Sequence, residues 1–412
     1  MATYAKRRAE DIPTSRRYAA LGFLMFAYFF YAWAWNTVDI LRPYIRDSVG
    51  MTLEQSGWLY SIQSLGALIG AVVMGQVADR MGRRNALVVT MVGYGTCLVA
   101  GAFVTNFWHL AVERSVMGFF MGSMYPIAVG IYSGLFASEQ RGLVAGFIMG
   151  TYNIAVAMLS FLAGQLLAAG YEWRTLLYAG VIPLLGSMLA FAIVPDDRKV
   201  SAWGADPNAP PVAQSKLPIA ELFLPAVRRQ TLLLATMTGL NFFAYQAFTG
   251  WATTYLKDVR GVEPDVVGTV LAFQFIASAI GGFAWGWISD RIGRRMAAFG
   301  FVAAAMLIPV YLFAPLSPAL FMATGFAYGF MLSCSTVWGP WLSELYPPHL
   351  RSTAASIFNW GRVISILAPP LTAALVPYWG MAPVMLLGCL AFLIAAAVWL
   401  SLPETLSRRK PA

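Results

Sequence analysis

The sequence predicts an all-α membrane protein of twelve transmembrane helices in two pseudo-symmetric six-helix halves. Three observations carry this prediction: twelve apolar stretches of membrane-spanning length, one long polar stretch between the sixth and the seventh, and a loop motif that occurs once in each half. The 412 residues are 59% hydrophobic and 11% charged, whereas about 25% of the residues of a soluble domain are charged. A water-soluble fold is therefore not expected.

The apolar stretches place the helices. A bilayer core about 30 Å thick requires about 20 apolar residues per helix. The first six predicted spans are 18–38, 57–76, 86–105, 109–134, 143–168 and 175–194, and the second six are 231–255, 266–288, 297–314, 318–340, 353–375 and 381–402. The stretch between the sets is rich in proline and aspartate and cannot form an apolar helix. We expect an amino-terminal half 1–195, a linker 196–229 and a carboxy-terminal half 230–412.

The lysines and arginines indicate the orientation. Of the 28, 21 fall in the two termini, the linker and alternate loops. Cytoplasmic loops carry an excess of positive charge, so we expect both termini to be cytoplasmic in a multi-pass protein of the plasma membrane, with a bacterial inner membrane favoured. The basic residues form short clusters between apolar stretches, so the net charge of +9 does not indicate a nucleic-acid partner.

A loop motif repeats between the halves. Gly75-Gln-Val-Ala-Asp-Arg-Met-Gly-Arg-Arg84 is echoed by Gly286-Trp-Ile-Ser-Asp-Arg-Ile-Gly-Arg-Arg295, and Arg141-Gly142 is echoed by Arg351-Ser352 at nearly the same separation. Two homologous halves explain both echoes. The predicted gating residues are Gly75, Asp79, Arg80, Arg83, Gly286, Asp290, Arg291, Arg294, Glu344 and Arg351.

Each residue type in the repeated loop has a physical reason to be there. The glycine lets a neighbouring helix approach closely, the aspartate accepts from a helix amino terminus or an arginine, and the arginines stay at the membrane surface. A basic turn that only sets the orientation is the alternative.

These motifs resemble the major facilitator superfamily, whose signature is this loop. Pro403-Glu404-Thr405 is similar to the Pro-Glu-Thr that ends the last helix in its sugar, organic-anion and aromatic-acid branches, and Arg114-x-x-x-Gly118-x-x-x-Gly122-x-x-x-Pro126 resembles a fourth-helix motif of its proton-coupled members. The resemblance implies secondary transport by alternating access, with no cofactor. We expect a monomer whose partners are a small solute, protons and the lipid bilayer.

Two positions depart from the family pattern. Glu344-Leu-Tyr-Pro-Pro-His-Leu-Arg351 resembles the loop after the tenth helix, but the first half has Gly134 at the position that matches Glu344. The stretch Asn36-Thr37-Val38-Asp39 keeps only the second aspartate of the Asp-Gly-x-Asp found in the aromatic-acid branch of proton symporters. Other carboxylate or sugar-acid carriers therefore stay open.

Charged side chains in or beside the predicted spans need a reason, because each costs about 2.5–3.5 kcal/mol at the centre of a membrane helix. They are Asp39, Glu113, Arg114 and Arg362. At a rise of about 1.5 Å per residue, Asp39 and Arg114 lie at similar depths in the outer part of the first half. We hypothesise that Asp39 is the protonation site and that a nearby Arg114 stabilises its charged form. A static ion pair, or an Asp39 at the outer interface, is the alternative.

Arg362 lies near the predicted midplane of the second half. No acidic residue of that half is predicted at its depth, and an arginine fork binds a carboxylate bidentately. Related organic-anion carriers have an arginine after a similar Asn-x-x-Gly stretch. We therefore expect Arg362 to bind an anionic substrate; a structural role, or pairing with Asp39 across the halves, is the alternative.

Other polar and aromatic residues at midplane depth are candidate substrate contacts, because transporter sites lie between repeats at the midplane. Any one of them is also a helix-packing residue in the simpler interpretation. They are Tyr31, Tyr125, Asn153, Asn241, Tyr245, Gln274, Asn359 and Trp360.

The sequence lacks the motifs of the other protein classes considered. The sequence has no His-Glu-x-x-His, no Gly-x-Ser-x-Gly and no Gly-Lys-Ser or Gly-Lys-Thr phosphate loop, and its cysteines show no metal-ligand spacing, so neither an enzyme, an ATP-driven pump nor a metal site is expected. We predict proton-coupled symport of a small carboxylated solute, an aromatic acid or a sugar acid. The alternatives are a proton-coupled drug antiporter, a neutral sugar carrier, and a receptor on the same fold.

Overall fold

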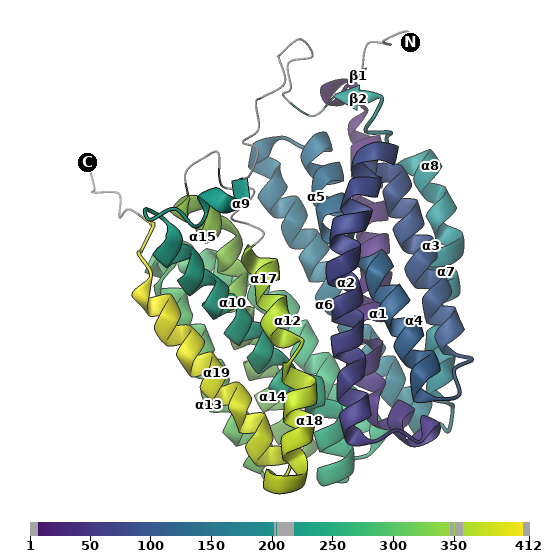
Figure 1. The fold of residues 1–412 in the computed structure, drawn as a ribbon, viewed down its shortest axis with the longest axis vertical. Coiled ribbons are helices and arrows are strands. Elements are labelled where there is room, and N and C mark those ends of the chain that lie inside the picture. The colour runs from purple at the N-terminus through teal and green to yellow at the C-terminus, as the bar shows by residue number, and fades with distance from the viewer. Residues whose placement is uncertain (1–6, 202, 204–217, 347–349, 351–356, 407–412) are drawn as a thin grey trace. The chain divides into compact units, whose positions relative to one another are not determined.

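The computed structural model describes residues 7–201, 203, 218–346, 350 and 357–406, apart from the side chains at 138, 218–219, 340, 343 and 358–360. The chain divides into two compact units, Met1–Leu159 with Ala169–Pro211, and Ser160–Ala168 with Val212–Ala412. Nearly all of the described residues are helical (Figure 1).

The helices of the first unit follow the predicted order. They are α1 (Thr14–Val49), α2 (Leu53–Met81), α3 (Arg83–Gly101), α4 (Phe107–Met121), α5 (Met124–Leu135) and α6 (Ser138–Ala168), followed by the consecutive segments η2 (Trp173–Gly180), α7 (Val181–Gly186), η3 (Ser187–Leu189) and α8 (Ala190–Ile193). A short helix η1 (Ala9–Asp11) precedes α1, and the strands β1 (Arg7–Arg8) and β2 (Val200–Ser201) pair in parallel.

The helices of the second unit begin after the short α9 (Pro218–Glu221). They are α10 (Arg228–Phe248) with η4 (Thr249–Trp251), α11 (Ala252–Thr254) and η5 (Tyr255–Val259); α12 (Pro264–Ile292); η6 (Met296–Ala298) with α13 (Phe299–Phe313); α14 (Pro318–Leu332) with η7 (Ser333–Val337) and α15 (Trp338–Leu345); α17 (Ile357–Ser365) with α18 (Ala368–Trp379); and α19 (Met381–Ser401).

Each predicted membrane span overlaps these helices, and residues 353–356 of the eleventh span lie outside the described residues. In the described part of the chain, ten helical segments are long and apolar enough to cross a bilayer, and α3 and α10 cover the other two predicted spans. The predicted all-α class with twelve spans is confirmed.

Helix α1 is longer than the sequence predicted. The predicted span ended at residue 38, yet the helix continues to Val49 and ends at Gly50, whose φ of 71° is a left-handed helix end. Arg42, which was predicted to lie in an outer loop, is only 1% exposed and forms an ion pair with Asp39 one turn earlier. Two charges that neutralise each other within the helix allow it to continue through an apolar environment.

Proline explains why some spans consist of two helices. A proline has no N–H for the carbonyl four residues earlier. Pro126 therefore leaves the carbonyl of Gly122 without its helical hydrogen bond, and α4 gives way to α5 at that point. Pro370 does the same for Ile366 between α17 and α18.

Glycines bring α2 and α4 into backbone contact (Figure 1). A Cβ atom at Gly118 would lie 2.0 Å from the carbonyl oxygen of Gln63, and one at Gly70 would lie 1.9 Å from that of Phe119. The second unit repeats the arrangement between α12 and α14, where a Cβ at Gly329 would lie 2.0 Å from the carbonyl oxygen of Gln274. Small residues at helix interfaces are the main means of tight packing in a membrane.

A cluster of aromatic side chains packs at one end of the second unit. Trp399 of α19 contacts Phe301 of α13, Trp338 of α15 and Trp341 of α15 at ring-centroid distances of 5.4, 5.3 and 5.7 Å. All four side chains are buried. This cluster holds the ends of α13, α15 and α19 together next to the loop that carries Arg294.

We predict that Gly118→Ala destabilises the first unit, because α2 and α4 would have to separate to admit the methyl group. Overpacking of this kind costs about 1–3 kcal/mol, which thermal unfolding of the purified protein in detergent measures. Gly75→Ala in α2 is the control, since a Cβ there meets no atom within 4 Å. Equal melting temperatures for the two variants would contradict the packing argument.

Candidate functional site

An aromatic and polar face of α1 lies against α6 in the first unit. Tyr31 stacks on Trp35 at 6.0 Å and contacts Tyr152 of α6 at 6.2 Å between ring centroids. The amide of Asn36 donates to the Tyr152 hydroxyl at 2.9 Å and to the carbonyl of Ala32 at 2.8 Å. Rings and an amide on one face provide stacking surfaces and a polar group for a planar ligand.

The carboxylate of Asp39 lies one turn beyond this face. It forms an ion pair with Arg42, and both side chains are buried. Arg42 also donates to the carbonyl of Ser56 in α2 at 3.2 Å. The pair therefore joins α1 to the start of α2.

A second buried ion pair lies on α4. Nε of Arg114 is 2.9 Å from Oε2 of Glu113, and their side chains are 0% and 6% exposed. Arg114 also donates to the carbonyl of Ala34 in α1 at 3.4 Å. This arginine thus connects α4 to the helix that carries Asp39.

The expected ion pair between Asp39 and Arg114 is not among those of the described residues. Each residue instead pairs with a neighbour on its own helix, Asp39 with Arg42 and Arg114 with Glu113. A partner one turn away or adjacent in sequence is available as soon as the helix forms. Their assignment to proton coupling stays a prediction.

Arg362 of the second unit is half-buried on α17. Its guanidinium lies over the ring of Phe242 in α10, 5.7 Å from the centroid, within the range of a cation–π interaction. The preceding Gly361 sets this position: a Cβ there would lie 2.6 Å from the backbone of Thr238 in α10. Only a glycine lets α17 approach α10 closely enough at this point.

The remaining predicted substrate contacts lie in different environments. Asn241 of α10 and Gln274 of α12 are buried, and their amide oxygens accept no hydrogen bond from any described residue. Asn153 instead donates to the carbonyl of Met149 within α6, at 3.3 Å.

Two predicted tyrosines differ in exposure. Tyr125 of α5 is 46% exposed, and Tyr245 of α10 is half-buried. Asn359 and Trp360 belong to α17, but their side chains lie outside the described residues.

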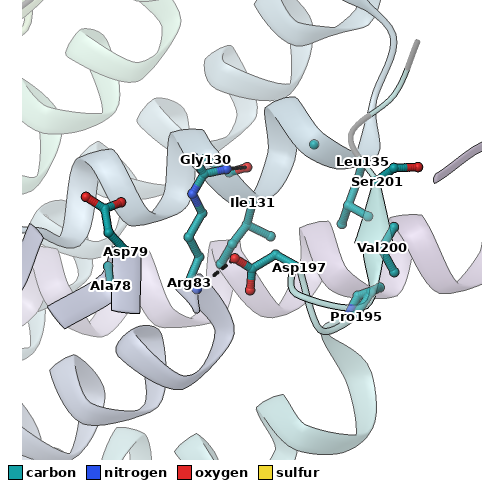
Figure 2. A pocket seen from close by; sticks show the side chains of 11 residues that line it. Ala78, Asp79, Arg83, Gly130, Ile131, Leu135, Pro195, Asp197, Val200 and Ser201 are labelled. Atoms are coloured by element: carbon teal, nitrogen blue, oxygen red, sulfur yellow. Dashed lines mark hydrogen bonds between the residues drawn. The ribbon is translucent and has the colours of Figure 1, made fainter. Parts of the chain in front are cut away.

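The loop between α2 and α3 is held by an aspartate that follows α8 (Figure 2). Asp197 accepts from the backbone N–H of Arg83 at 3.0 Å and of Arg84 at 3.4 Å, so it caps the amino terminus of α3. The Arg83 side chain donates to the carbonyl of Gly130 in α5 at 2.8 Å. These groups and Asp79 line a cavity of about 430 Å³.

The loop between α12 and α13 repeats this cap. Glu404 accepts from the backbone N–H of Arg294 at 3.0 Å and of Arg295 at 2.9 Å. Gly293 has a φ of 105°, and a Cβ there would lie 2.5 Å from the Glu404 carboxylate. The glycine is therefore required twice, by its backbone angle and by the close carboxylate.

The two loops differ in their ion pairs. Arg294 pairs with Asp290 at 2.7 Å and with Glu344 at 3.5 Å. The Arg83 side chain has no carboxylate partner among the described residues and donates to the carbonyl of Gly130. Gly134, at the position that matches Glu344, lines the cavity beside it. The described ion pairs of the two loops therefore differ.

Other gating predictions have mixed outcomes. Gly75 and Gly286 were expected to admit a neighbouring helix, but a Cβ at either meets no described atom within 4 Å, so this reason is wrong. Arg80 is exposed, and Arg291 lies 3.5 Å from the centroid of the Trp287 ring. Arg351 lies outside the described residues.

Two carboxylates at these loops, Glu404 and Asp196, have lowered pKa values. Partial burial alone raises the pKa of Glu404, but hydrogen bonds from the backbone N–H groups of Leu406, Arg295, Arg294 and Thr405 outweigh it, and the net pKa is lower than that of an ordinary glutamate. Beside the other cap, burial likewise raises the pKa of Asp196, and the net pKa is lowered by hydrogen bonds from Arg198 and the charge of Arg84. Both acids stay ionised at neutral pH.

Sequence reasoning missed several of these residues. Arg42 was assigned to a loop, although its spacing of three from Asp39 was a signal for a pair within one helix. Asp197 was assigned to the linker, although Pro195-Asp196-Asp197 after the sixth span corresponds to Pro403-Glu404 after the twelfth. Comparing the two span ends would have found this third echo.

Comparisons with known proteins agree with this fold. The family model described as Major Facilitator Superfamily matches residues 24–273 and 257–412. A bacterial homologue of the human lysosomal transporter Spinster, solved in an inward-facing and unoccupied conformation, superposes with a TM-score of 0.77 over 95% of this chain and 97% of that one. Its sequence identity of 15% makes this a similarity of fold.

Two curated relatives are similar over most of their length. A cis,cis-muconate transport protein of Acinetobacter baylyi is 24% identical over 79% of each chain. A gallate transporter of Pseudomonas putida is 25% identical over 88% of this chain and 86% of that one. Both are transporters and not enzymes.

We predict that Glu404→Gln lowers the melting temperature at neutral pH, because the N–H groups at the start of α13 lose a charged acceptor. A carboxylate with a lowered pKa stabilises the fold above the ordinary glutamate pKa of about 4.3, and this contribution is lost as the pH falls further. The variant should therefore lose less stability than the wild type between roughly pH 5 and pH 3.

The control is Glu263→Gln, an exposed glutamate whose side chain makes no capping hydrogen bond at the start of α12. Melting curves across this pH range that are the same for Glu404→Gln, Glu263→Gln and the wild type would show that the Glu404 cap has no such effect.

Proposed function

Because this chain belongs to the major facilitator superfamily, we propose that it transports a small carboxylated organic solute together with protons, by alternating access. The two halves, 1–195 and 230–412, change their orientation around a site near the membrane midplane. Both termini and the linker lie on the cytoplasmic side of a bacterial inner membrane. No nucleotide or cofactor takes part.

The observation that carries the proposal is the half-buried Arg362, a cation within a membrane helix. Its guanidinium lies over the Phe242 ring, and the planar fork of a guanidinium matches the two oxygens of a carboxylate. Muconate and gallate, in the names of two relatives, are both carboxylates. An acid that carries a ring or conjugated chain also suits a site with aromatic side chains.

The first half supplies such aromatic side chains. Tyr31 and Trp35 of α1, with Tyr152 of α6, offer ring faces for stacking, and Asn36 offers an amide beside them. In the second half, the amide oxygens of Asn241 and Gln274 accept no hydrogen bond from any described residue, so each could accept one from a hydroxyl group of a substrate. Each half thus offers side chains that suit part of such a solute.

The buried Asp39 is the proposed proton-binding group. When Asp39 is ionised, it neutralises Arg42; when it takes up a proton, Arg42 loses its counter-ion and its hold on α1 changes. Protonation also makes the inward movement of an anion electrically easier, since the net charge that crosses the membrane potential falls. The proton gradient would then drive accumulation of the solute.

We predict that Arg362→Lys keeps the charge yet loses most of the affinity. A charge-assisted hydrogen bond is worth about 1.5–3 kcal/mol, and each 1.4 kcal/mol is about tenfold in affinity, so KM should rise roughly ten- to a hundredfold. The assay is uptake of radiolabelled aromatic acids, other carboxylates and sugar acids into proteoliposomes with an imposed inward proton gradient. Arg362→Ala should abolish uptake.

Arg228→Lys is the matched control, because Arg228 is an exposed arginine at the start of α10. Acid uptake that survives Arg362→Ala would contradict the assigned role. Movement of cationic dyes with no uptake of any acid would favour drug antiport, and uptake of neutral sugars alone would favour a sugar carrier.

We further predict that Asp39→Asn abolishes the proton flux that accompanies substrate uptake, measured with a pH-sensitive dye inside the proteoliposomes. Because the change leaves Arg42 buried without its carboxylate, the yield of folded protein is measured in parallel. Proton uptake that persists at the wild-type ratio to substrate would remove Asp39 from the mechanism.

A further inference from the structure

The buried acid Glu113 has no part in the function proposed above. Its side chain is 6% exposed, and Arg114 is its ion-pair partner. Neither carboxylate oxygen accepts a hydrogen bond from any residue that the structure describes. A buried carboxylate is normally surrounded by several donors, so this one is held in its charged form by a single contact.

Glu113 lines a cavity of about 360 Å³ between α3 and α4. Cys97 and Ala100 of α3 lie on one side, and Val112 and Val116 of α4 lie on the other. Val112 is 64% exposed and Phe103, at the same cavity, 69% exposed. Because α4 belongs to a membrane span, such exposed apolar side chains contact lipid, and the cavity is accessible from the hydrocarbon.

A histidine stands at the end of the same cavity. His109, in the first turn of α4, is exposed, and its ring is held by the Thr105 hydroxyl and the Asn106 amide, both at 3.2 Å. It precedes Glu113 by four residues, so the two side chains lie on one face of the helix about 6 Å apart along its axis. Histidine gains and loses a proton near neutral pH.

Glu113 is linked to α1 through Arg114. The arginine, wholly buried, is in contact with Glu113 at 2.9 Å and donates to the carbonyl of Ala34 at 3.4 Å. A proton on Glu113 would cancel the charge that holds Arg114, which would then move toward other acceptors, among them the backbone of α1. The aromatic face and Asp39 lie on that helix.

The other titratable groups around Glu113 are few among the described residues. His109 and Arg114 are on its own helix, Cys97 faces it from α3, and Arg174 of η2 donates to the carbonyl of Val104 at the cavity, at 3.2 Å. None of these except Arg114 is in ionic contact with the carboxylate. Among the described residues, Arg114 is therefore the group that stabilises the charged carboxylate by direct contact.

We propose that Glu113 is a second protonation site of the transport cycle, that it receives its proton from the membrane edge through His109, and that Arg114 transmits the loss of charge to α1. The proton passes from the imidazolium nitrogen of His109, directly or through water, to a carboxylate oxygen of Glu113. The imidazole becomes neutral, the carboxyl becomes neutral, and the contact with Arg114 is released. The inference rests on the proposed function for its role in coupling, but not for the chemistry of the site.

The first test needs no substrate. Dicyclohexylcarbodiimide reaches carboxyl groups through lipid and reacts with the protonated form, leaving an N-acylurea that mass spectrometry locates. In proteoliposomes of the full chain, we expect labelling of Glu113 that falls about tenfold per pH unit above its pKa, as the protonated fraction does. Glu54, exposed at the start of α2, is the internal control and should stay unlabelled.

The second test uses transport. Glu113→Gln should lose proton-driven accumulation at least about tenfold, because the amide cannot carry a proton, while exchange of labelled for unlabelled solute, which needs no net proton movement, continues at a measurable rate. His109→Gln should slow accumulation and shift its dependence on external pH. Glu54→Gln is the matched control.

The two tests separate the two claims. Absence of Glu113 labelling at every pH between 5 and 8 overturns the site, as does accumulation by Glu113→Gln equal to that of the wild type. Labelling of Glu113 in a protein that carries no acid at all would contradict the proposed function and leave the lipid-accessible protonatable site standing.

Discussion

The pairing of charges inside the helices is the constraint on which this structure depends. A lone charge in the hydrocarbon is costly, and the first unit meets this with two pairs formed by neighbours in sequence, Asp39 with Arg42 and Glu113 with Arg114. Each arginine also donates to the backbone of another helix, at Ser56 or at Ala34. The pairs therefore neutralise charge and hold helices in register at the same time. A proton that disrupts either pair therefore changes both the local charge and the contact between helices.

Close helix packing positions these pairs. Glycines at the contacts of α2 with α4 leave no room even for a methyl group, so α4 presents Arg114 to α1 at a fixed depth. The second unit repeats the contact between α12 and α14 and repeats the carboxylate cap at the following loop. The repeat is incomplete where Gly134 replaces the glutamate that Arg294 contacts in the second unit. We infer that the two loops stabilise their units unequally.

Much of the fold could be predicted from the sequence because its signals are local. Apolar length predicts each span, and the repeated Asp-Arg-x-Gly-Arg-Arg loop predicts two related halves. The site was harder to predict, because it depends on which neighbouring residue each charged side chain pairs with. Helix α1 was predicted to end at residue 38 with Arg42 in an outer loop, and the depth estimate then favoured Arg114 as the partner of Asp39. Hydropathy treats charges singly and cannot register that two of them cancel. The close contact between α2 and α4 occurs at Gly118 and not at Gly75. Which glycine faces the neighbouring helix depends on the rotation of each helix about its axis, which the length of an apolar stretch does not specify.

The most direct measurement of the central claim is the pH change outside proteoliposomes when a transported acid is added without an imposed gradient. In a weakly buffered medium, with pyranine outside, an anion that enters together with protons removes those protons from the medium and makes it alkaline. The account predicts alkalinisation on addition of muconate or gallate that is absent in empty liposomes and is dissipated by a protonophore. Acidification, or uptake of the acid with no change in pH, would contradict symport with protons.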